Sequence, residues 1–556
     1  MQLFSIFCIN ADAQTIGTVT DKIFTFISLD LHDGHTVDEI VISSGKVTKP
    51  GNDWPLRSNG TREWITGNGL QGMTKAVEHF DVLIVGAGIS GIGAACHLTK
   101  KSPNHSFAIL EGRENLGGTW DLFRYPGIRS DSDMYTLGYS FKPWTEKNAI
   151  ADGDKILDYL NETVDENGFR DKIRFRHKVL RSNWSAADNR WHVEAVLGED
   201  EKVTFSCNYL FMCSGYYNYD QGYMPDFEGV EAFKGPIIHP QKWDQGLAYS
   251  GKKVIVIGSG ATAVTLVPSM AKDAAHVTML QRSPTYVVSR PAADKIALFL
   301  KKWLSAKIAY KLVRTKNVLM TIFMYNLARK KPEGFKAKLL EMVREEMGPD
   351  YDVDTHFTPS YKPWDQRLCL VPDADLFDCI KNGSASVVTN HIERFTEKGI
   401  LLKSGETLEA DIIVPATGLR LQSLGGMELA VNDKTVDISK TTNYKGMSLS
   451  NVPNFAWTVG YTNASWTLKA DLTADYVCRL LNHMEKNGYQ NCTPVLRGDE
   501  AGEAPLLDFT SGYIQRSIAD LPKQGAVPPW KNHQNYIADL MHLKFEKVDD
   551  GIMNFG

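Results

Sequence analysis

Residues 80–91 read FDVLIVGAGISG, and this stretch decides the fold of the chain. A compact apolar run ends at Val85 and leads into Gly86, Gly88 and Gly91 in the spacing GxGxxG. The first glycine permits a tight turn, the second lets the backbone approach a pyrophosphate, and the third lets a helix pack closely on a strand. The stretch therefore predicts the strand, phosphate-binding loop and helix of a Rossmann-like domain.

The strand that follows this first glycine-rich loop ends in an acid. Residues 107–110, FAIL, form a second short apolar run, and Glu111 lies 20 residues after Gly91. A carboxylate in this position accepts hydrogen bonds from ribose hydroxyls. A lone GxGxxG is weak evidence, but a strand, glycines, a helix, a strand and a terminal acid in register are strong evidence for a dinucleotide site.

A second glycine-rich loop occurs at residues 254–263, VIVIGSGATA, with Gly258, Gly260 and Ala263 in the same spacing. The next strand ends in Arg282 and its neighbours instead of an acid. A carboxylate there would repel a 2′-phosphate, whereas Arg282 would bind one, unless it is an ordinary solvated charge. Two dinucleotide sites of different chemistry predict FAD in the first and NADPH in the second.

The composition fits a globular enzyme of two or three domains. The chain has 556 residues, 43% of them hydrophobic and 23% charged, and its net charge of −5 does not favour nucleic acid. Eight scattered cysteines show neither a CxxC pair nor zinc-ligand spacing. We therefore expect isolated thiols in the cytoplasm, no metal and, because no run of 18 apolar residues occurs, no spanning helix.

Two further motifs lie beyond and between the glycine-rich loops. Residues 117–131 read GGTWDLFRYPGIRSD and resemble the GGxW…YPG…D signature of class B flavoprotein monooxygenases. Residues 233–244, FKGPIIHPQKWD, match the FxGxxxHxxxW fingerprint of Baeyer–Villiger monooxygenases at every fixed position. Those positions are Phe233, Gly235, His239 and Trp243. The resemblance covers about residues 78–545 and is strongest to the mycobacterial ethionamide-activating subgroup.

The resemblance implies roles for several residues. Gly118, Trp120 and Asp131 are expected at the flavin, and so is Thr467 near the start of a helix whose N-terminus would stabilise negative charge on the flavin ring. The fingerprint residues are expected to couple domain motion, not to act as acid or base. Prolines at positions 236 and 240 argue for an ordered loop there despite the i,i+4 spacing of His239 and Trp243.

The implied activity is an FAD-containing, NADPH-dependent monooxygenase. It would insert one oxygen atom from O2 into a ketone, forming an ester or lactone, and would also oxygenate sulfides or thioamides. Such chemistry needs a cation beside the flavin. We expect Arg290 to be that cation and Asp131 to orient it, although the family arginine can also align with Pro291. An ordinary salt bridge and a helix cap are the structural alternatives for these two residues.

Two other functions remain open from the sequence. An oxygenase acting only on nitrogen or sulfur would share both cofactors, although relatives of that kind usually carry an aromatic residue other than Trp at the position of Trp243. A flavin-binding redox sensor would bind FAD without NADPH turnover.

The expected fold is α/β, with two Rossmann-like dinucleotide-binding domains, the second inserted into the first, and a helical insertion. We expect the working start at Met73. The predicted segments are an extension outside the catalytic fold at 1–72, the first part of the FAD domain at 73–215, the NADP domain at 216–415 with helices at about 291–350, and the rest of the FAD domain with a tail at 416–556.

Residues 295–332 contain ten Lys or Arg and no acid, interleaved with large apolar residues. This pattern predicts basic amphipathic helices. One interpretation is an insertion that packs its apolar stripe on the second nucleotide domain. The other is peripheral contact with an anionic membrane by an otherwise cytoplasmic enzyme.

Overall fold

The computed structural model describes residues 77–498, 502–507 and 509–556. The prediction of an extension at 1–72 lies outside these residues. Contacts join Lys75–Gly556 into one compact unit. Within the described ranges, no helix combines the length and hydropathy needed to cross a membrane.

The first sheet contains the strand that was predicted to end at Val85, before the first glycine-rich loop. Strand β1 (Glu78–Val85) pairs in parallel with β2 (Phe107–Leu110) on one side and with β6 (Glu201–Met212) on the other. The order of the sheet is β17-β16-β4-β5-β6-β1-β2-β3, and β20 also pairs with β6. The other members are β3 (Ile173–Arg174), β4 (His177–Ser185), β5 (Arg190–Leu197), β16 (Glu428–Val431), β17 (Lys434–Thr435) and β20 (Phe455–Trp457).

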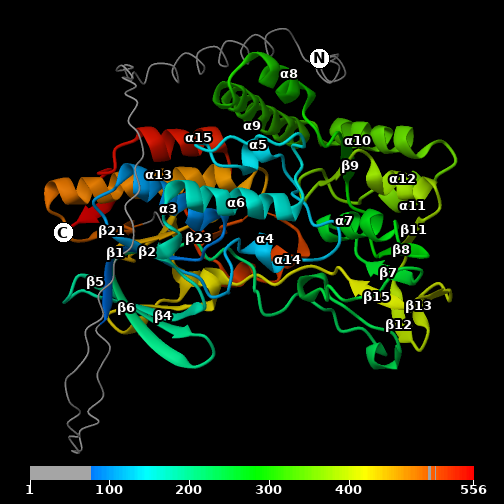
Figure 1. Cartoon of the computed structure of the whole chain (residues 1–556), viewed down its shortest axis with the longest axis horizontal. Helices are drawn as coiled ribbons and strands as arrows, with labels where there is room; N and C mark the ends of the chain where they lie inside the picture. The colour runs from blue at the N-terminus through cyan, green and yellow to red at the C-terminus, as the bar shows by residue number, and fades with distance from the viewer. Residues whose placement is uncertain (1–76, 499–501, 508) are drawn as a thin grey trace, which may run out of the picture. The chain divides into compact units, whose positions relative to one another are not determined.

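Two helices from opposite ends of the chain cover this sheet. Helix α3 (Ile89–Lys101) follows the first glycine-rich loop and buries its small residues, and α13 (Trp466–Asn487) packs against it. A third helix, α6 (Gly153–Asn167), also packs on α3. Because α13 and strands of the same sheet follow the second domain in sequence, the first domain is split in sequence, as predicted (Figure 1).

The second sheet has four parallel strands in the order β11-β8-β7-β15. Its strands are nearly all apolar because both faces are covered, as parallel sheets require. They are β7 (Lys253–Ile257), β8 (His276–Gln281), β11 (Ala385–Thr389) and β15 (Ile412–Pro415), with α7 (Ala261–Met270) after β7. The predicted α/β class with two Rossmann-like sheets is confirmed.

The helical insertion bridges the two domains. It consists of α8 (Lys295–Trp303), α9 (Ala306–Lys330) and α10 (Pro332–Met347). The C-terminal half of α9 packs with α10 and with β9 (Val287–Arg290), on the side of the second domain. Its N-terminal half lies instead on α5 (Met134–Leu137) of the first domain (Figure 1). The insertion therefore packs apolar side chains on the second domain, as one interpretation expected, and it also contacts the first domain through the N-terminal half of α9.

Arg314 explains why the first half of α9 is drawn to the first domain. Its buried guanidinium donates to the carbonyl oxygens of Tyr135 at 2.9 Å and Gly138 at 2.7 Å. It also pairs with buried Asp471 on α13 at 3.5 Å. An apolar stripe read from the sequence cannot show this, because the partners of the arginine lie about 150 residues or more away in the chain.

We predict that Arg314→Ala lowers the free energy of unfolding by about 3–5 kcal/mol, since Asp471 would keep a buried charge without this partner. Urea denaturation measures the loss. The matched control is Arg170→Ala, whose exposed pair with Asp165 (2.6 Å) should contribute far less to stability. Equal losses in the two variants would contradict the assignment of Arg314 as a buried anchor.

Candidate functional site

The first glycine-rich loop has the geometry that its spacing predicts. Gly86 has φ +104, and a Cβ there would lie 2.7 Å from the carbonyl oxygen of Cys213, so no larger residue fits. The backbones of Gly88 and Gly118 approach each other closely at the start of α3. Trp120 follows in α4 (Thr119–Leu122) and is half-buried. The two glycine motifs therefore form one backbone-lined site.

Glu111 closes this site. Its carboxylate accepts hydrogen bonds from the backbone N–H of Ala87 at 2.7 Å and of Arg113 at 2.9 Å. Burial raises the pKa of Glu111, and the two N–H donors oppose that shift. The carboxylate is thus held against the glycine-rich loop at the end of β2, where a ribose hydroxyl could reach it.

The N-terminus of α13 lies at the same site, and no side chain caps its first backbone N–H groups. The hydroxyl of Ser465 bonds to Thr136 Oγ1 at 2.7 Å instead of capping the first turn. Thr467 is fully buried, yet its Oγ1 has no hydrogen-bond partner among the described residues. Trp466 stacks on Tyr216 and donates to Ser90 Oγ at 2.8 Å, next to the loop. A buried orphan hydroxyl and a positive helix end fit the polar edge of a flavin.

The second glycine-rich loop is more open than the first. Gly258 has φ +134, and a Cβ there would lie 2.5 Å from Ala416 O. A Cβ on Gly260 would meet nothing within 4 Å, so this glycine leaves space for a ligand. Ala263 is buried in the core of the second domain, and Arg282 is exposed beyond the end of β8. An exposed arginine at this strand end is available to a 2′-phosphate.

The chain passes from the first domain to the second and back again. The two connecting segments, which we call the crossings, are hydrogen-bonded to each other. Tyr223 N donates to Gly418 O at 3.0 Å, and Asn218 N donates to Arg420 O at 2.9 Å. The fingerprint residues follow the first crossing. Phe233 is buried, Trp243 packs half-buried on the second domain, and a Cβ on Gly235 would lie 2.2 Å from Asp411 O. Apart from one 3-10 turn (Pro240–Lys242), this segment is the expected loop.

His239 ties the two crossings together. Its Nδ1 accepts from Gln241 N at 3.2 Å, so the proton lies on Nε2, which donates to Gly418 O at 3.2 Å. Burial lowers the pKa of His239, and the hydrogen bond to Gly418 opposes that shift. The neutral imidazole is thus a structural link, in keeping with the expected coupling role.

Asp131 and Arg290 are not brought together. Asp131 pairs with Arg367, 236 residues later in the chain. Arg290 ends β9, is reached by solvent, and has its pKa lowered by desolvation, which the charge of Asp133 opposes. Sequence reasoning missed Arg367, because its partner Asp131 lies 236 residues earlier in the chain.

Two pockets meet near the N-terminus of α13. The apolar pocket adjoins Ser465. Its lining side chains include Val318, Ile322 and Tyr325 of α9 with Ala464, Leu468 and Tyr536. The neighbouring polar pocket shares Gln534 with it.

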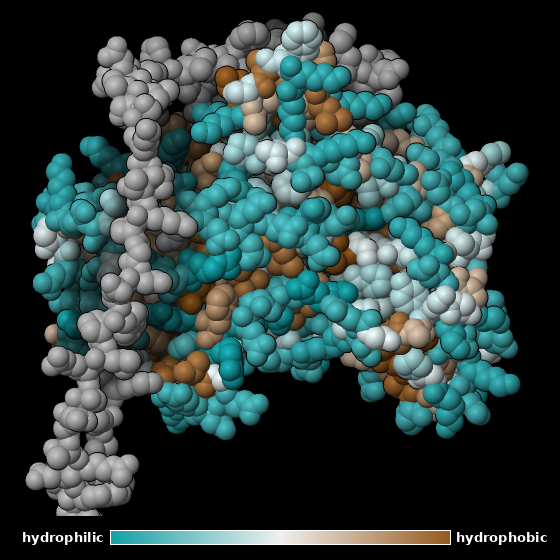
Figure 2. Space-filling model, in the orientation of Figure 1, coloured by the Kyte–Doolittle hydropathy of each residue, from teal (hydrophilic) through white to brown (hydrophobic). Residues whose placement is uncertain are grey.

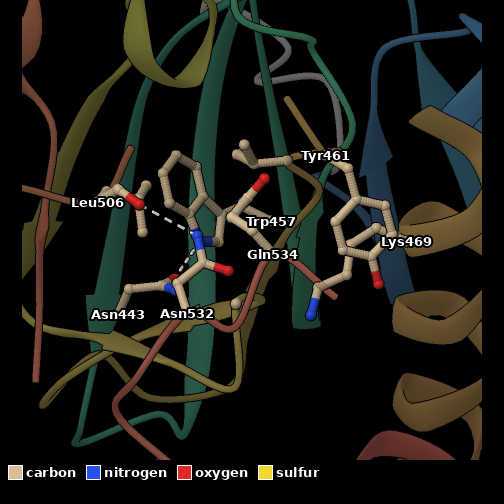
Figure 3. Close-up of a pocket in the computed structure, with 9 residues that line it drawn as sticks. Asn443, Trp457, Tyr461, Lys469, Leu506, Asn532 and Gln534 are labelled. Atoms are coloured by element: carbon tan, nitrogen blue, oxygen red, sulfur yellow. Dashed lines mark hydrogen bonds between the residues drawn. The ribbon is translucent and has the colours of Figure 1, made fainter. Parts of the chain in front are cut away.

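The polar pocket has buried Lys469 on one side and Asn443 and Asn532 on the other (Figure 3). Lys469 pairs with Asp539 at 3.0 Å and donates to Lys445 O at 3.0 Å. Its charge is therefore neutralised within the protein. The apolar pocket is the better candidate for a carbon-rich substrate.

We predict different effects from two substitutions in the second loop. Gly258→Ala forces a strained φ and a clash, so the free energy of unfolding should fall by about 1–3 kcal/mol. Gly260→Ala has room and φ −80, so its unfolding should match the parent while its methyl group weakens NADPH binding. Thermal unfolding and NADPH titration measure the two effects. A Gly260→Ala variant with parental NADPH affinity would place the phosphates elsewhere.

A pH dependence follows from His239. Its pKa is lower in the folded state, so the unfolded state binds the proton more readily and stability falls as pH drops below about 6.5. His239→Gln should remove that part of the pH dependence. Urea denaturation of parent and variant on both sides of this pH isolates the difference, because the other histidines are common to both. Parallel pH profiles would show that His239 does not titrate differently on folding.

Comparisons with known proteins agree with this geometry. The chain is 54% identical over 479 residues to the FAD-containing monooxygenase EthA of Mycobacterium tuberculosis (strain ATCC 25618 / H37Rv), covering 86% of this chain and 98% of the relative. An open crystal structure of cyclohexanone monooxygenase has a TM-score of 0.68 at 20% identity, over 86% of this chain and 100% of that chain.

A structure of OTEMO in complex with FAD and NADP has a TM-score of 0.62 at 23% identity, over 75% of this chain and 88% of that chain. Residues 80–447 match the family described as flavin-binding monooxygenase-like. This match covers more than half of the chain and includes both glycine-rich loops. The chain therefore belongs to the flavin-binding monooxygenase-like family.

Proposed function

We propose that this protein binds FAD and NADPH and inserts one oxygen atom from O2 into ketones, forming esters or lactones, with oxygenation of sulfides or thioamides as a second activity. The observation that carries the proposal is the complete FxGxxxHxxxW fingerprint on the crossing between two glycine-rich loops. The 54% identity to an FAD-containing monooxygenase supports it.

FAD would be held by the first loop and by the N-terminus of α13. Gly86, Gly88 and Gly91 leave the backbone open to the pyrophosphate, and Glu111 accepts from the ribose. The hydroxyl of Thr467 and the first N–H groups of α13 would be the donors available to the polar edge of the ring. Such donors would stabilise negative charge on a reduced flavin.

NADPH would be held by the second loop. Gly260 leaves the space for phosphate, and Arg282 pairs with the 2′-phosphate. Bound FAD would supply the redox chemistry, accepting hydride from NADPH and activating O2. His239 keeps the two loops linked through the crossings without taking part as acid or base.

The activated oxygen carries negative charge, which needs a fixed cation in a site shielded from water. We assign this cation to Arg290, which is exposed at the end of β9 and forms no ion pair with a carboxylate in the described part of the chain. Asp131 is engaged by Arg367, so reorientation of Asp131 toward Arg290 would have to accompany cofactor binding. Arg367 is the second candidate, because it already has the orienting carboxylate.

The substrate would occupy the apolar pocket. It adjoins Ser465 at the start of α13, which places it beside the proposed flavin edge. Its aliphatic and aromatic lining suits a small molecule with little charge. The substrates would meet the protein at a membrane surface, with residues 295–332 in peripheral contact.

We predict that purified protein with NADPH and air converts ketones to products one oxygen heavier. The assay offers linear, cyclic and aryl ketones with methyl aryl sulfides, and mass spectrometry identifies the products. Sulfoxides without esters would move the protein to the heteroatom oxygenases. Bound FAD without NADPH turnover would support the redox sensor instead.

Substitutions of Arg290 and of Arg367 distinguish which of the two arginines is the cation. Arg290→Ala should still allow NADPH to reduce FAD but should lower ester formation at least about a hundredfold. Arg290→Lys, which keeps the charge, should recover part of that loss. If Arg290→Ala leaves the ester yield undiminished while Arg367→Ala abolishes it, the cation is Arg367.

A further inference from the structure

Helix α8 and the start of α9 expose large apolar side chains. Trp303 is 77% exposed, Phe299 62%, Ile308 52% and Ile296 45%. Ile296, Phe299 and Trp303 have spacings of i, i+3 and i+7, which place them on one face of α8. We call these four residues the apolar ridge. Figure 2 shows hydrophobic side chains gathered at the upper edge of the molecule over these helices, beside hydrophilic ones.

The ridge is bordered by lysines without partners. Lys295, Lys302, Lys307 and Lys311 are exposed, and none of them pairs with a carboxylate in the ranges that the structure describes. Two other lysines near the ridge are engaged. Lys316 pairs with Asp294 at 2.7 Å, and the side-chain amine of Lys301 donates to backbone carbonyls at 3.1 Å. The free positive charges thus lie on the same exposed helices as the ridge.

These features match an anionic lipid surface. Interfacial helices bury aromatic and aliphatic residues at the headgroup boundary while lysines pair with lipid phosphates. A second copy of the chain would oppose lysines to lysines across a twofold axis, and like charges there are unfavourable. Charge complementarity therefore favours lipid over self-association.

Helix α9 runs from the apolar ridge to the apolar pocket. It begins at the ridge with Ile308 and then contributes Val318, Ile322 and Tyr325 to the apolar pocket. At a rise of 1.5 Å per residue, the pocket residues lie about 15–25 Å along the helix from Ile308. A protein docked by the ridge would hold its apolar pocket within reach of molecules dissolved in the bilayer.

We propose that the apolar ridge and its four lysines dock the protein on an anionic membrane, from which apolar substrates pass along α9 into the apolar pocket. The second half of this inference rests on the proposed function. The docking itself does not, because it needs only the ridge and its charges.

The test uses the full chain with bound FAD and vesicles of phosphatidylglycerol and phosphatidylcholine, or of phosphatidylcholine alone. The parent should co-sediment with the anionic vesicles and much less with the neutral ones. The double variant Phe299→Ser, Trp303→Ser should lower the bound fraction at least about tenfold. Lys302→Glu, Lys307→Glu should do the same by removing the charge attraction. The matched control is Leu180→Ser, an apolar residue of β4 that is 43% exposed.

Turnover distinguishes docking from catalysis. A water-soluble ketone should be oxygenated equally by the parent and both double variants, whereas a ketone carried in anionic vesicles should be oxygenated more slowly by the variants. Equal vesicle binding by the parent and the Phe299→Ser, Trp303→Ser variant would overturn the docking. A parental dimer that this variant loses, without any effect on vesicles, would assign the ridge to a second copy and also overturn it. Vesicle binding without oxygenation of any ketone would refute the proposed function while docking stands.

Discussion

The carbonyl oxygen of Gly418 accepts two hydrogen bonds, from Tyr223 N at 3.0 Å and from His239 Nε2 at 3.2 Å. The chain leaves the first domain once and returns once, and this oxygen is where the outgoing and returning segments meet. This link adds to the packing of α9 against both domains, which also joins them. The carbonyl oxygen of Gly418 and the neutral imidazole of His239 hold the two crossings in a fixed register. The rest of each domain packs around its own sheet.

Helix α9 is a second link of a different kind. Its first half is held by hydrogen bonds and charge through Arg314, and its second half by apolar packing around Ala328 and Phe335. The two kinds of contact respond differently to solvent, because apolar packing is non-directional whereas the guanidinium bonds need exact geometry. A single helix thereby connects a rigid anchor, the apolar pocket and the exposed ridge.

The charged and polar groups near the site differ in whether they have a partner within the protein. Lys469 and Asp539 neutralise each other inside the polar pocket, so that pocket offers little net field. Glu111 keeps its acceptors turned to backbone N–H groups, and Thr467 keeps an unused hydroxyl beside the start of α13. Arg290 is exposed at the end of β9 and has no ion pair with a carboxylate of the described residues. A buried polar group without a partner costs free energy, and among these groups only Thr467 is in that state.

The sequence by itself determined the features that depend on near neighbours in the chain. The spacing of glycines in residues 86–91 and 258–263, the apolar strands before them and the acid or arginine after the next strand follow from backbone sterics and side-chain size over about 30 residues. The split first domain followed from the order of these units along the chain. The α/β class and the family could therefore be predicted.

Tertiary structure alone decided which distant charges meet. Asp131 was expected beside Arg290 but pairs with Arg367, and α9 was expected on one domain but spans two because Arg314 finds carbonyls of the other. Periodicity shows that a residue faces inward or outward, not which partner it faces. That choice depends on how the two domains close around each other, which is set by the sum of many contacts between segments far apart in sequence.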